Sequence, residues 1–359
     1  MKHIIISDTH APQCIYKALN HAQDLIEEQE DIEAIVINGD LLGIFSMTGS
    51  NLYKGEWIQK EIMDEFLKKA APKFYEEFKK TGVVTKKLAY EYIGERYAWT
   101  YKILRASTKI KKTIFNLGNH ESKLHFLVVN ELSFLTGCDR NILNSLDNKI
   151  LEKIYDLFEK NLKLLENEND FIYIRNKHHI HNKTLILGIP GESHDTEDLN
   201  PTSIKQEQKT KLILENASKD LDKCNEIIIY NHTQGAYDRE TGTFQPASSY
   251  LKGFLKEIKK NKPIIFIQSH NHWSYTQCMY QENIHYIMNN AGLHDGVFNL
   301  VETNEEEVIC YDVDPNTKKT IKLKFSDKKE SYNSEEELIS RYYEDPKIIF
   351  DRKSKVKNE

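Results

Sequence analysis

Several features that mark secreted, membrane-bound or zinc-knuckle proteins are missing from this sequence. The five cysteines are odd in number and widely separated, and no two form a CxxC pair, which argues against a disulfide framework or a zinc knuckle. No apolar run approaches the length of a membrane span, and Ile4–Ile6 is too short for the core of a signal peptide. We therefore expect ordinary reduced thiols, a cytoplasmic protein and no membrane partner.

An excess of positive charge is missing as well. The formal net charge is −6, so bulk charge does not indicate a nucleic-acid partner, although a local basic patch is compatible with one. Of the 359 residues, 39% are hydrophobic and 29% are charged, which is typical of a globular chain long enough for a large core. Because internal repeats and low-complexity linkers are also missing, we expect one domain carrying insertions.

Short polar motifs follow the first two strand-like runs of the chain. Asp8 and His10 come directly after the apolar run His3–Ser7, and Asp40 comes after Ala34–Asn38. Helical spacing of apolar residues between the two runs predicts a βαβ unit. Both motifs then lie at the carboxyl ends of neighbouring strands, which is the edge of an α/β sheet where ligands bind.

The same arrangement recurs three more times. In order, the later motifs are Gly118-Asn119-His120-Glu121 after Thr113–Leu117, Asn231-His232 after Glu226–Tyr230, and Ser269-His270-Asn271-His272 after Pro263–Gln268. A lone Asp-x-His or Gly-Asp after a strand is a common turn. Gly-Asn-His-Glu is rarer and Ser-His-Asn-His is suggestive by itself, and the ordered set is far harder to obtain by chance.

These motifs supply a set of possible metal ligands. Carboxylate, amide and imidazole groups bind divalent ions, and a two-ion site needs about seven or eight of them. The chain offers Asp8, His10, Asp40, Asn119, His232, His270 and His272. The last two would share one face of a regular strand, and on a loop past its end they could reach two neighbouring ions.

The rest of the chain divides into helical insertions and further strands. We expect one domain over residues 1–325, with helical insertions at about 46–112 and 122–170, followed by a charged tail over 326–359 with one docked helix. Pro72 either kinks the first inserted helix or starts a second one. Further strands are predicted at Phe171–Arg175, Thr184–Ile189, Ile284–Met288, Gly296–Glu302, Val308–Asp312 and Thr320–Phe325, and helices at Thr85–Arg105, Thr210–Leu221 and Ser249–Lys259.

The first insertion interleaves aromatic and cationic side chains between Tyr90 and Arg105. Such a segment could stack bases and hold phosphates. Aromatic residues in a helix core with cations on its solvated face would give the same pattern, and we favour that second interpretation.

The ordered motifs resemble those of the calcineurin-like metallophosphoesterase superfamily. That family has Asp-x-His, Gly-Asp, Gly-Asn-His-Glu/Asp, a His after a strand, and Gly-His-x-His, and the resemblance covers about Lys2 to Glu302 without the inserted helices. The fold it implies is α/β, a four-layer αββα sandwich of two mixed β-sheets flanked by helices. The activity it implies is phosphoester hydrolysis by a dinuclear metal centre with a metal-activated hydroxide as nucleophile.

The resemblance also implies a role for each motif residue. Asp8, His10, Asp40 and His272 would hold one ion and Asp40, Asn119, His232 and His270 the other, with Asp40 bridging. His120 would act on the leaving oxygen as a general acid or as a stabilising cation. The implied cofactors are two divalent ions, manganese first, with iron, zinc or nickel also permitted by mixed nitrogen and oxygen ligands. Glu121 is expected only to cap the loop or hydrogen-bond to it.

Three positions depart from the patterns of the superfamily. Ser269 stands where glycine is usual, so the last loop is expected to have a slightly different backbone. Leu117 replaces the arginine of the Ser/Thr protein phosphatases, and Leu41-Leu42-Gly43 replaces their Asp-Arg. The chain is therefore not expected to belong to that branch, and Gly43 offers no carboxylate to orient His120.

Other histidines compete for roles. His194 is an alternative to His232, which we favour because the run before it is the better buried strand. His178, His179 and His181 are expected on a hairpin between two weak strands, and His294 at a turn.

The expected function is hydrolysis of phosphomonoesters or phosphodiesters in a phosphorylated small molecule or nucleotide. A nuclease of the same superfamily acting on DNA or RNA is the alternative, supported by the cationic aromatic insertion. A non-catalytic binding or structural protein that keeps the fold is a second alternative, although such proteins usually lose ligands. Selectivity is expected to belong to the inserted segments, and the sequence specifies no oligomeric state.

Overall fold

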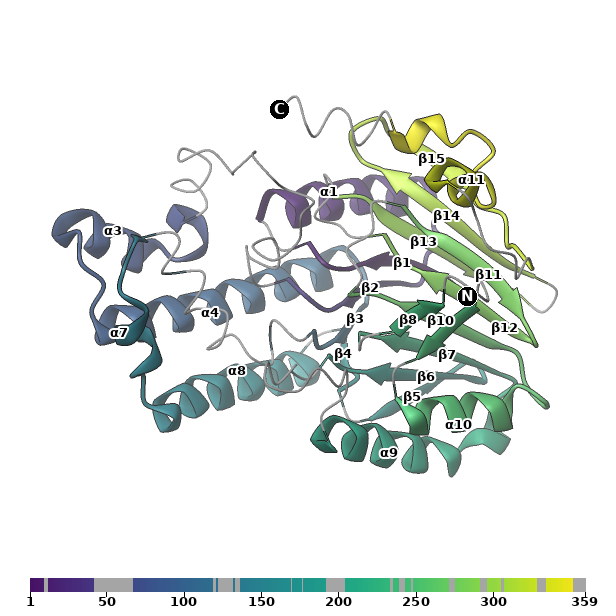
Figure 1. The fold of residues 1–359 in the computed structure, drawn as a ribbon, viewed down its shortest axis with the longest axis horizontal. Helices are drawn as coiled ribbons and strands as arrows, with labels where there is room; N and C mark the ends of the chain where they lie inside the picture. Colours follow the sequence, from purple (N-terminus) through teal and green to yellow (C-terminus); the bar gives the residue numbers. More distant parts are fainter. Residues whose placement is uncertain are drawn as a thin grey trace.

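Two β-sheets pack face to face, with helices on their outer sides (Figure 1). This is the mixed α/β sandwich expected from the sequence. The computed structural model describes residues 1–9, 12–41, 67–118, 121, 132, 136–168, 170–175, 177–191, 204–232, 235–238, 243–246, 248–270, 275–290, 296–304, 307–327 and 334–350.

The first sheet has the strand order β15-β14-β13-β1-β2-β3-β4. Its four parallel strands are β1 (Lys2–Ile6), β2 (Ala34–Asn38), β3 (Thr113–Asn116) and β4 (Phe171–Tyr173). Three antiparallel strands extend it on one side: β13 (Phe298–Thr303), β14 (Val308–Asp314) and β15 (Lys319–Lys322). The carboxyl ends of β1 to β4 therefore lie along one edge.

The second sheet has the order β11-β12-β10-β7-β6-β5. Its parallel strands are β6 (Thr184–Ile189), β7 (Glu226–Asn231), β10 (Ile264–Gln268) and β12 (Ile284–Met288). Antiparallel edge strands flank them, β5 (His178–His181) and β11 (Gln277–Gln281). A separate hairpin joins β8 (Gly235–Asp238) to β9 (Thr243–Pro246).

The helices form layers outside both sheets (Figure 1). On the side of the first sheet lie α1 (Pro12–Glu28), α3 (Pro72–Thr81), α4 (Lys86–Ile110), α7 (Arg140–Asn144) and α8 (Asn148–Glu168). The second sheet is covered by α9 (Ile204–Ser218) and α10 (Ser249–Ile258), and a short 3-10 helix spans Leu221–Lys223. Among the described residues, no helix combines the length and the apolar character needed to cross a bilayer.

Alternate side chains of β1 pack on opposite faces of the first sheet. Ile4 and Ile6 pack into the cluster formed with the helices, whereas Ile5 packs into the cluster between the sheets and around the second one. All three side chains are fully buried. Because successive side chains of a strand point to opposite faces, a strand in the middle of the sandwich must be apolar on both.

Local signals in the sequence set the helix ends. Pro72 occupies the first turn of α3, so of the two predicted alternatives, a kink or a new helix, the structure has the new helix. Gly82 ends α3 in the left-handed conformation. Thr85 caps α4 by accepting a hydrogen bond from Leu88 N. Ser248 caps α10 in the same way by accepting from Leu251 N.

The strands that sequence periodicity did not predict lie at sheet edges or in the separate hairpin. His178, His179 and His181 form the edge strand β5, which turns into β6 through Asn182 and Lys183, both with positive φ. Two residues with positive φ match the type of turn that joins twisted strands. The histidines thus lie on a hairpin, as predicted, but inside a strand that pairs with β6. The strand before them, β4, belongs to the first sheet, so the expected position of the histidines between two paired weak strands was wrong.

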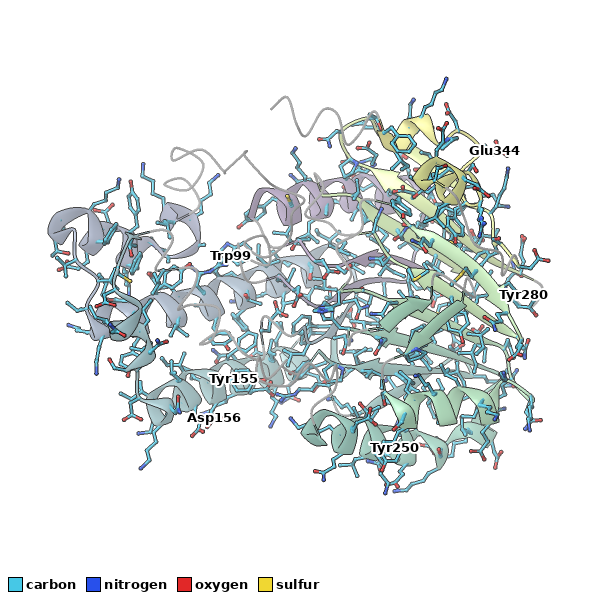
Figure 2. The ribbon with its side chains drawn as sticks, viewed as in Figure 1. Trp99, Tyr155, Asp156, Tyr250, Tyr280 and Glu344 are labelled. Atoms are coloured by element: carbon cyan, nitrogen blue, oxygen red, sulfur yellow. The ribbon has the colours of Figure 1, made fainter. Side chains whose placement is uncertain are left out.

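The aromatic residues of the first insertion are part of the core. Tyr92, Tyr97 and Trp99 on α4 are buried at 0%, 5% and 4% relative exposure. Trp99 and, on the neighbouring helix α8, Tyr155 are labelled within the helical layer in Figure 2. The helix-core interpretation is confirmed for these side chains, and they are not available to stack on bases.

The chain after β15 packs back onto the sandwich. Helix α11 (Glu335–Ser340) begins after Ser334, whose hydroxyl accepts a hydrogen bond from Glu337 N. Its apolar side chains and those that follow it join the core cluster around the second sheet: Leu338, Ile339, Tyr342, Tyr343 and Ile349. The predicted docked helix is thus present, and it is short.

Packing of α8 predicts a contrast between two leucines. Leu162 is fully buried, whereas Leu157 is 58% exposed. Leu162→Ala should lower the free energy of unfolding by about 2–5 kcal/mol, because it removes buried methyl groups and leaves a cavity. Leu157→Ala should change it by no more than about 0.5 kcal/mol. Urea denaturation of both variants measures the difference, and equal losses would contradict the packing of this helix.

The environment of His3 predicts that the folded protein loses stability in acid. Its Nδ1 lies 2.6 Å from the Tyr230 hydroxyl, and burial, followed by the nearby N-terminal ammonium, lowers the pKa of His3 from 6.5 to about 3. The folded state favours the neutral ring, so its contribution to stability is present above pH 6.5 and is lost as pH falls toward 3.

We expect the unfolding free energy of the wild type to fall below pH 6.5, by up to about 1.4 kcal/mol per pH unit from this group. His3→Gln should be less stable at pH 7 and should show a shallower slope. Urea denaturation between pH 7 and 4.5 measures both, and identical slopes in the two proteins would contradict the assignment.

Candidate metal centre

Four of the seven predicted ligands lie in the described part of the chain, and the fold brings them together. Asp8 and Asp40 follow β1 and β2 of the first sheet, and His232 and His270 follow β7 and β10 of the second. The carboxyl edges of the two sheets therefore meet at one place. Outside the described residues lie His10, Asn119, His272, the proposed catalytic His120 and the competing His194 and His294.

Three of the four side chains, Asp40, His232 and His270, are close enough to share an ion, and Asp8 lies beside His232. His232 Nε2 lies 3.0 Å from Asp40 Oδ2 and 3.9 Å from Asp8 Oδ1, and His270 Nδ1 lies 4.0 Å from Asp40 Oδ2. One ligand atom each from Asp40, His232 and His270 lie within 4.8 Å of one another. Both aspartates and His232 are buried, so this cluster is shielded from solvent.

Three of these residues adopt a backbone conformation that is unfavourable for a side chain. The φ angles of Asp8, Asp40 and His270 are 50°, 55° and 83°. The left-handed region costs about 1 kcal/mol or more per non-glycine residue and occurs often at functional sites. Its repeated use directly after three strands indicates that the fold turns each motif sharply at the strand end.

Two motif glycines allow the motif loops to approach each other. A Cβ atom on Gly39, whose φ is 79°, would lie 2.5 Å from His232 Nδ1. A Cβ atom on Gly118 would overlap Asp40 Oδ1 and lie 2.7 Å from Glu121 Oε2. Close packing therefore requires glycine at both positions, and at Gly39 the left-handed backbone conformation favours it as well.

His232 has one ring nitrogen committed to the backbone. Its Nδ1 lies 2.6 Å from the carbonyl oxygen of Asn38, which fits donation from Nδ1–H. Nε2 then faces the two aspartates with its lone pair, which is the usual arrangement of a metal-ligating imidazole. The same contact with Asn38 explains why this histidine, at the end of β7, points toward β2.

The electrostatics of the cluster favour a positive charge. Burial lowers the pKa of His232, but Asp40, Asp8 and the Asn38 carbonyl outweigh it and raise the pKa from 6.5 to about 10. A divalent ion would replace the proton at this position, because a histidine ligand must be neutral. Two carboxylates and two imidazoles form a mixed nitrogen and oxygen donor set that fits manganese, iron, zinc or nickel.

Within the described ranges, this is the one group of at least three potential ligands close enough to hold an ion. The histidines of β5 have other partners: His178 Nε2 lies 2.7 Å from Asp220 Oδ2, and His181 Nε2 lies 3.2 Å from Glu33 Oε2. No metal site is indicated there.

Glu121 holds two motif loops together. Its Oε2 accepts hydrogen bonds from the backbone N–H of Asp40 and of Gly118, each at 2.9 Å. The side chain is fully buried, and the Tyr97 hydroxyl on α4 donates to its carbonyl oxygen at 2.7 Å. Glu121 was expected only to cap its loop or hydrogen-bond to it, whereas in the structure it links the second and third motifs to the inserted helix α4.

A network of buried amides lies behind the cluster and was missed by sequence analysis. Asn116 Nδ2 donates to Asn38 Oδ1 at 2.8 Å and to the Tyr230 carbonyl at 3.0 Å. Asn38 Nδ2 donates in turn to Ser269 Oγ at 2.7 Å. These bonds join the ends of β2 and β3 to those of β7 and β10, so they tie one sheet to the other. The available signal was the asparagine that ends each of β2, β3 and β7.

Ser269 has a structural reason to differ from the usual glycine. Its hydroxyl accepts the hydrogen bond from Asn38, and its backbone N–H donates to the Asn231 carbonyl at 3.0 Å. The departure noted in the sequence therefore gives the last motif an extra bond to the first sheet.

Substitution of Glu121 tests how much its carboxyl group stabilises the motif loops, independently of metal binding. We expect Glu121→Ala to lower the unfolding free energy by about 3 kcal/mol, because it leaves two buried N–H groups without their acceptor. Glu121→Gln keeps an acceptor oxygen and should lose less. Urea denaturation in the presence of a chelator measures both effects without metal, and a loss below about 0.5 kcal/mol for Glu121→Ala would contradict the role.

The chain matches a known family over most of its length. Residues 1–298 match the family model described as calcineurin-like phosphoesterase. No curated protein sequence matches the chain.

Among solved structures, the chain is similar to a putative 5'-nucleotidase from Staphylococcus aureus, with 12% identity and a TM-score of 0.41 over 98% of this chain and 58% of that one. A 5'-nucleotidase from Candida albicans has 9% identity and a TM-score of 0.38, over 88% of this chain and 51% of that one. An anchor protein in the inner membrane complex of Plasmodium has 12% identity and a TM-score of 0.40, over 98% of this chain and 94% of that one. The chain thus spans little more than half of the two nucleotidases. The family match over residues 1–298 assigns the chain to the calcineurin-like phosphoesterase family.

Proposed function

We propose that the protein is a metal-dependent hydrolase of phosphoesters, a phosphomonoesterase or phosphodiesterase that acts on a phosphorylated small molecule or nucleotide. One observation carries the proposal. Asp8, Asp40, His232 and His270, from four strands and two sheets, come together in a buried cluster in a chain of the calcineurin-like phosphoesterase family.

The residues that would hold two divalent ions are those of the five motifs. We assign Asp8, His10, Asp40 and His272 to one ion and Asp40, Asn119, His232 and His270 to the other. The closeness of Asp40 Oδ2 to both His232 and His270 supports its assignment to the second ion. When bound, divalent ions in such sites lower the pKa of a water molecule and polarise the phosphoryl oxygens.

The protein itself would supply orientation and proton transfer. Glu121 and the amide network fix the loops, so the ligands are held in place before substrate binds. We assign His120 to the leaving oxygen, where an imidazolium donates a proton or stabilises the developing negative charge. Position 43, after the second motif, is glycine, so it offers no carboxylate to orient that imidazole.

The nuclease alternative loses its strongest sequence support. Its basis was the aromatic and cationic insertion, and the described aromatics Tyr92, Tyr97 and Trp99 are buried in the helical layer. The formal net charge of −6 also disfavours a polyanionic substrate. We therefore place small phosphoesters before nucleic acids.

Two substitutions test the activity. Asp40→Asn and His120→Ala should each remove manganese-stimulated hydrolysis of an aryl phosphate, the second by about 10²–10⁴-fold as expected for loss of a general acid. Asp31→Asn and His181→Ala are matched controls on residues away from the cluster and should keep full activity. Metal analysis of the manganese-loaded wild type should find two ions per chain.

Retention of hydrolysis in both Asp40→Asn and His120→Ala would contradict the proposal. Fewer than one ion per chain in the wild type would instead favour a binding protein that keeps the fold. A comparison of aryl monoesters with diesters across a panel of divalent metals then assigns the ester class and the preferred ion.

A further inference from the structure

The C-terminal segment 334–350 lies outside residues 1–298, which match the family, but hydrogen bonds of its Tyr343 link it to both sheets of the sandwich. In Figure 1 it is the yellow segment that contains α11, and Glu344, labelled in Figure 2, follows Tyr343 directly. Tyr343 is fully buried. A tail that only covered apolar surface would not need a tyrosine hydroxyl in the interior, so the partners of this hydroxyl are informative.

The Tyr343 hydroxyl has two buried partners. It donates to Asp312 Oδ2 at 2.6 Å, and it accepts from the backbone N–H of Thr276 at 2.9 Å. Asp312 lies on β14 of the first sheet, and Thr276 stands just before β11 of the second. One hydroxyl therefore joins the C-terminal segment to both sheets.

The second oxygen of Asp312 continues the chain of hydrogen bonds. Asp312 Oδ1 accepts from Asn290 Nδ2 at 2.9 Å, and both side chains are fully buried. Asn290 follows Asn289 at the end of β12. The carboxyl group of Asp312 thus fixes the turn after β12 to the Tyr343 hydroxyl.

The turn after β12 is hydrogen-bonded to the loops that carry Asp8 and His270. Asn289 Nδ2 donates to Ser7 Oγ at 2.7 Å, and Ser7 is the residue before Asp8. Asn289 N donates to the Gln268 carbonyl at 2.8 Å, two residues before His270. The loops also bond each other, since His270 N donates to Asp8 Oδ2 at 3.1 Å.

We propose that Tyr343 is a positioning residue for the metal centre, acting through Asp312 and Asn290 on the loops that carry Asp8 and His270. The inference rests on the proposed function, because the metal centre is what the chain of bonds positions. Every link is buried, and a low-dielectric surrounding makes such a chain strong when complete and costly when broken. The segment after residue 298 would then be part of the active structure of this protein.

Manganese affinity tests the proposal without reference to hydrolysis. Tyr343→Phe removes one oxygen atom and takes away a partner of both Asp312 and Thr276. We expect its manganese dissociation constant, measured by electron paramagnetic resonance titration of free manganese, to rise about tenfold, the lower end of the range for outer-shell partners. Tyr342→Phe makes the same change at the adjacent buried tyrosine and should bind as the wild type does.

Asp312→Asn is the second variant, since it keeps the shape of the side chain while replacing one acceptor oxygen with a donor. It should also weaken manganese binding about tenfold, and combination with Tyr343→Phe should add little, because both act in one chain. All titrations are made well below the melting midpoint of each variant. If Tyr343→Phe does not fold, the manganese affinity of Asp312→Asn alone tests the positioning role.

The outcomes distinguish the two proposals. Wild-type affinity in Tyr343→Phe and Asp312→Asn, with only a lower melting midpoint, would overturn the positioning role and leave the proposed function intact. A tenfold loss in Tyr342→Phe as well would show a general effect of the segment and would also overturn it. Failure of the wild type itself to bind manganese is seen before any variant is compared and would overturn the proposed function.

Discussion

Two buried carboxylates at the meeting edge of two sheets are the constraint on which the rest of this structure depends. Asp8 and Asp40 are almost fully shielded from water and face the same imidazole, His232. Burial of like charges is costly unless a cation or several hydrogen bonds compensate. The raised pKa of His232 is the response of the metal-free protein to that cost, and a divalent ion is a stronger compensation.

Support for this cluster is organised in layers that extend well beyond the ligands. Glu121 fixes the backbone at Asp40 and Gly118, and the amides of Asn38 and Asn116 fasten one sheet to the other directly behind it. Further away, Asp312 and Tyr343 hold the turn after β12. Glu121 from within a motif and residues from outside the motifs together hold the candidate ligands, three of which have strained backbone conformations.

The inserted helices are coupled to the same cluster. Helix α4 carries Tyr97, whose hydroxyl donates to the Glu121 carbonyl, and its other aromatic side chains fill the layer between α3, α8 and the first sheet. Changes in this insertion can therefore reach the third motif through this buried hydrogen bond.

The sequence by itself determined the order of the motifs, the strands that precede them and the donor set. These follow from local rules: an apolar run of four to six residues makes a central strand, and the polar residues after it must leave the sheet at its edge. The sandwich architecture was also predictable, by resemblance. At Pro72 the geometry of proline left two alternatives, a kink or a new helix, and the structure has the start of α3.

Only the tertiary structure decided which side chains meet. Strands β5 and β11 exist because neighbouring strands pair with them, and no apolar alternation marks them in the sequence. Glu121, Ser269 and Tyr343 act on residues 81, 231 and 31 positions away in the chain, at Asp40, Asn38 and Asp312. A hydrogen bond across such a separation depends on how the sheets pack, and local spacing carries no record of it. The sequence therefore supplies the candidate ligands, and the packing of the two sheets decides how the described ones are held.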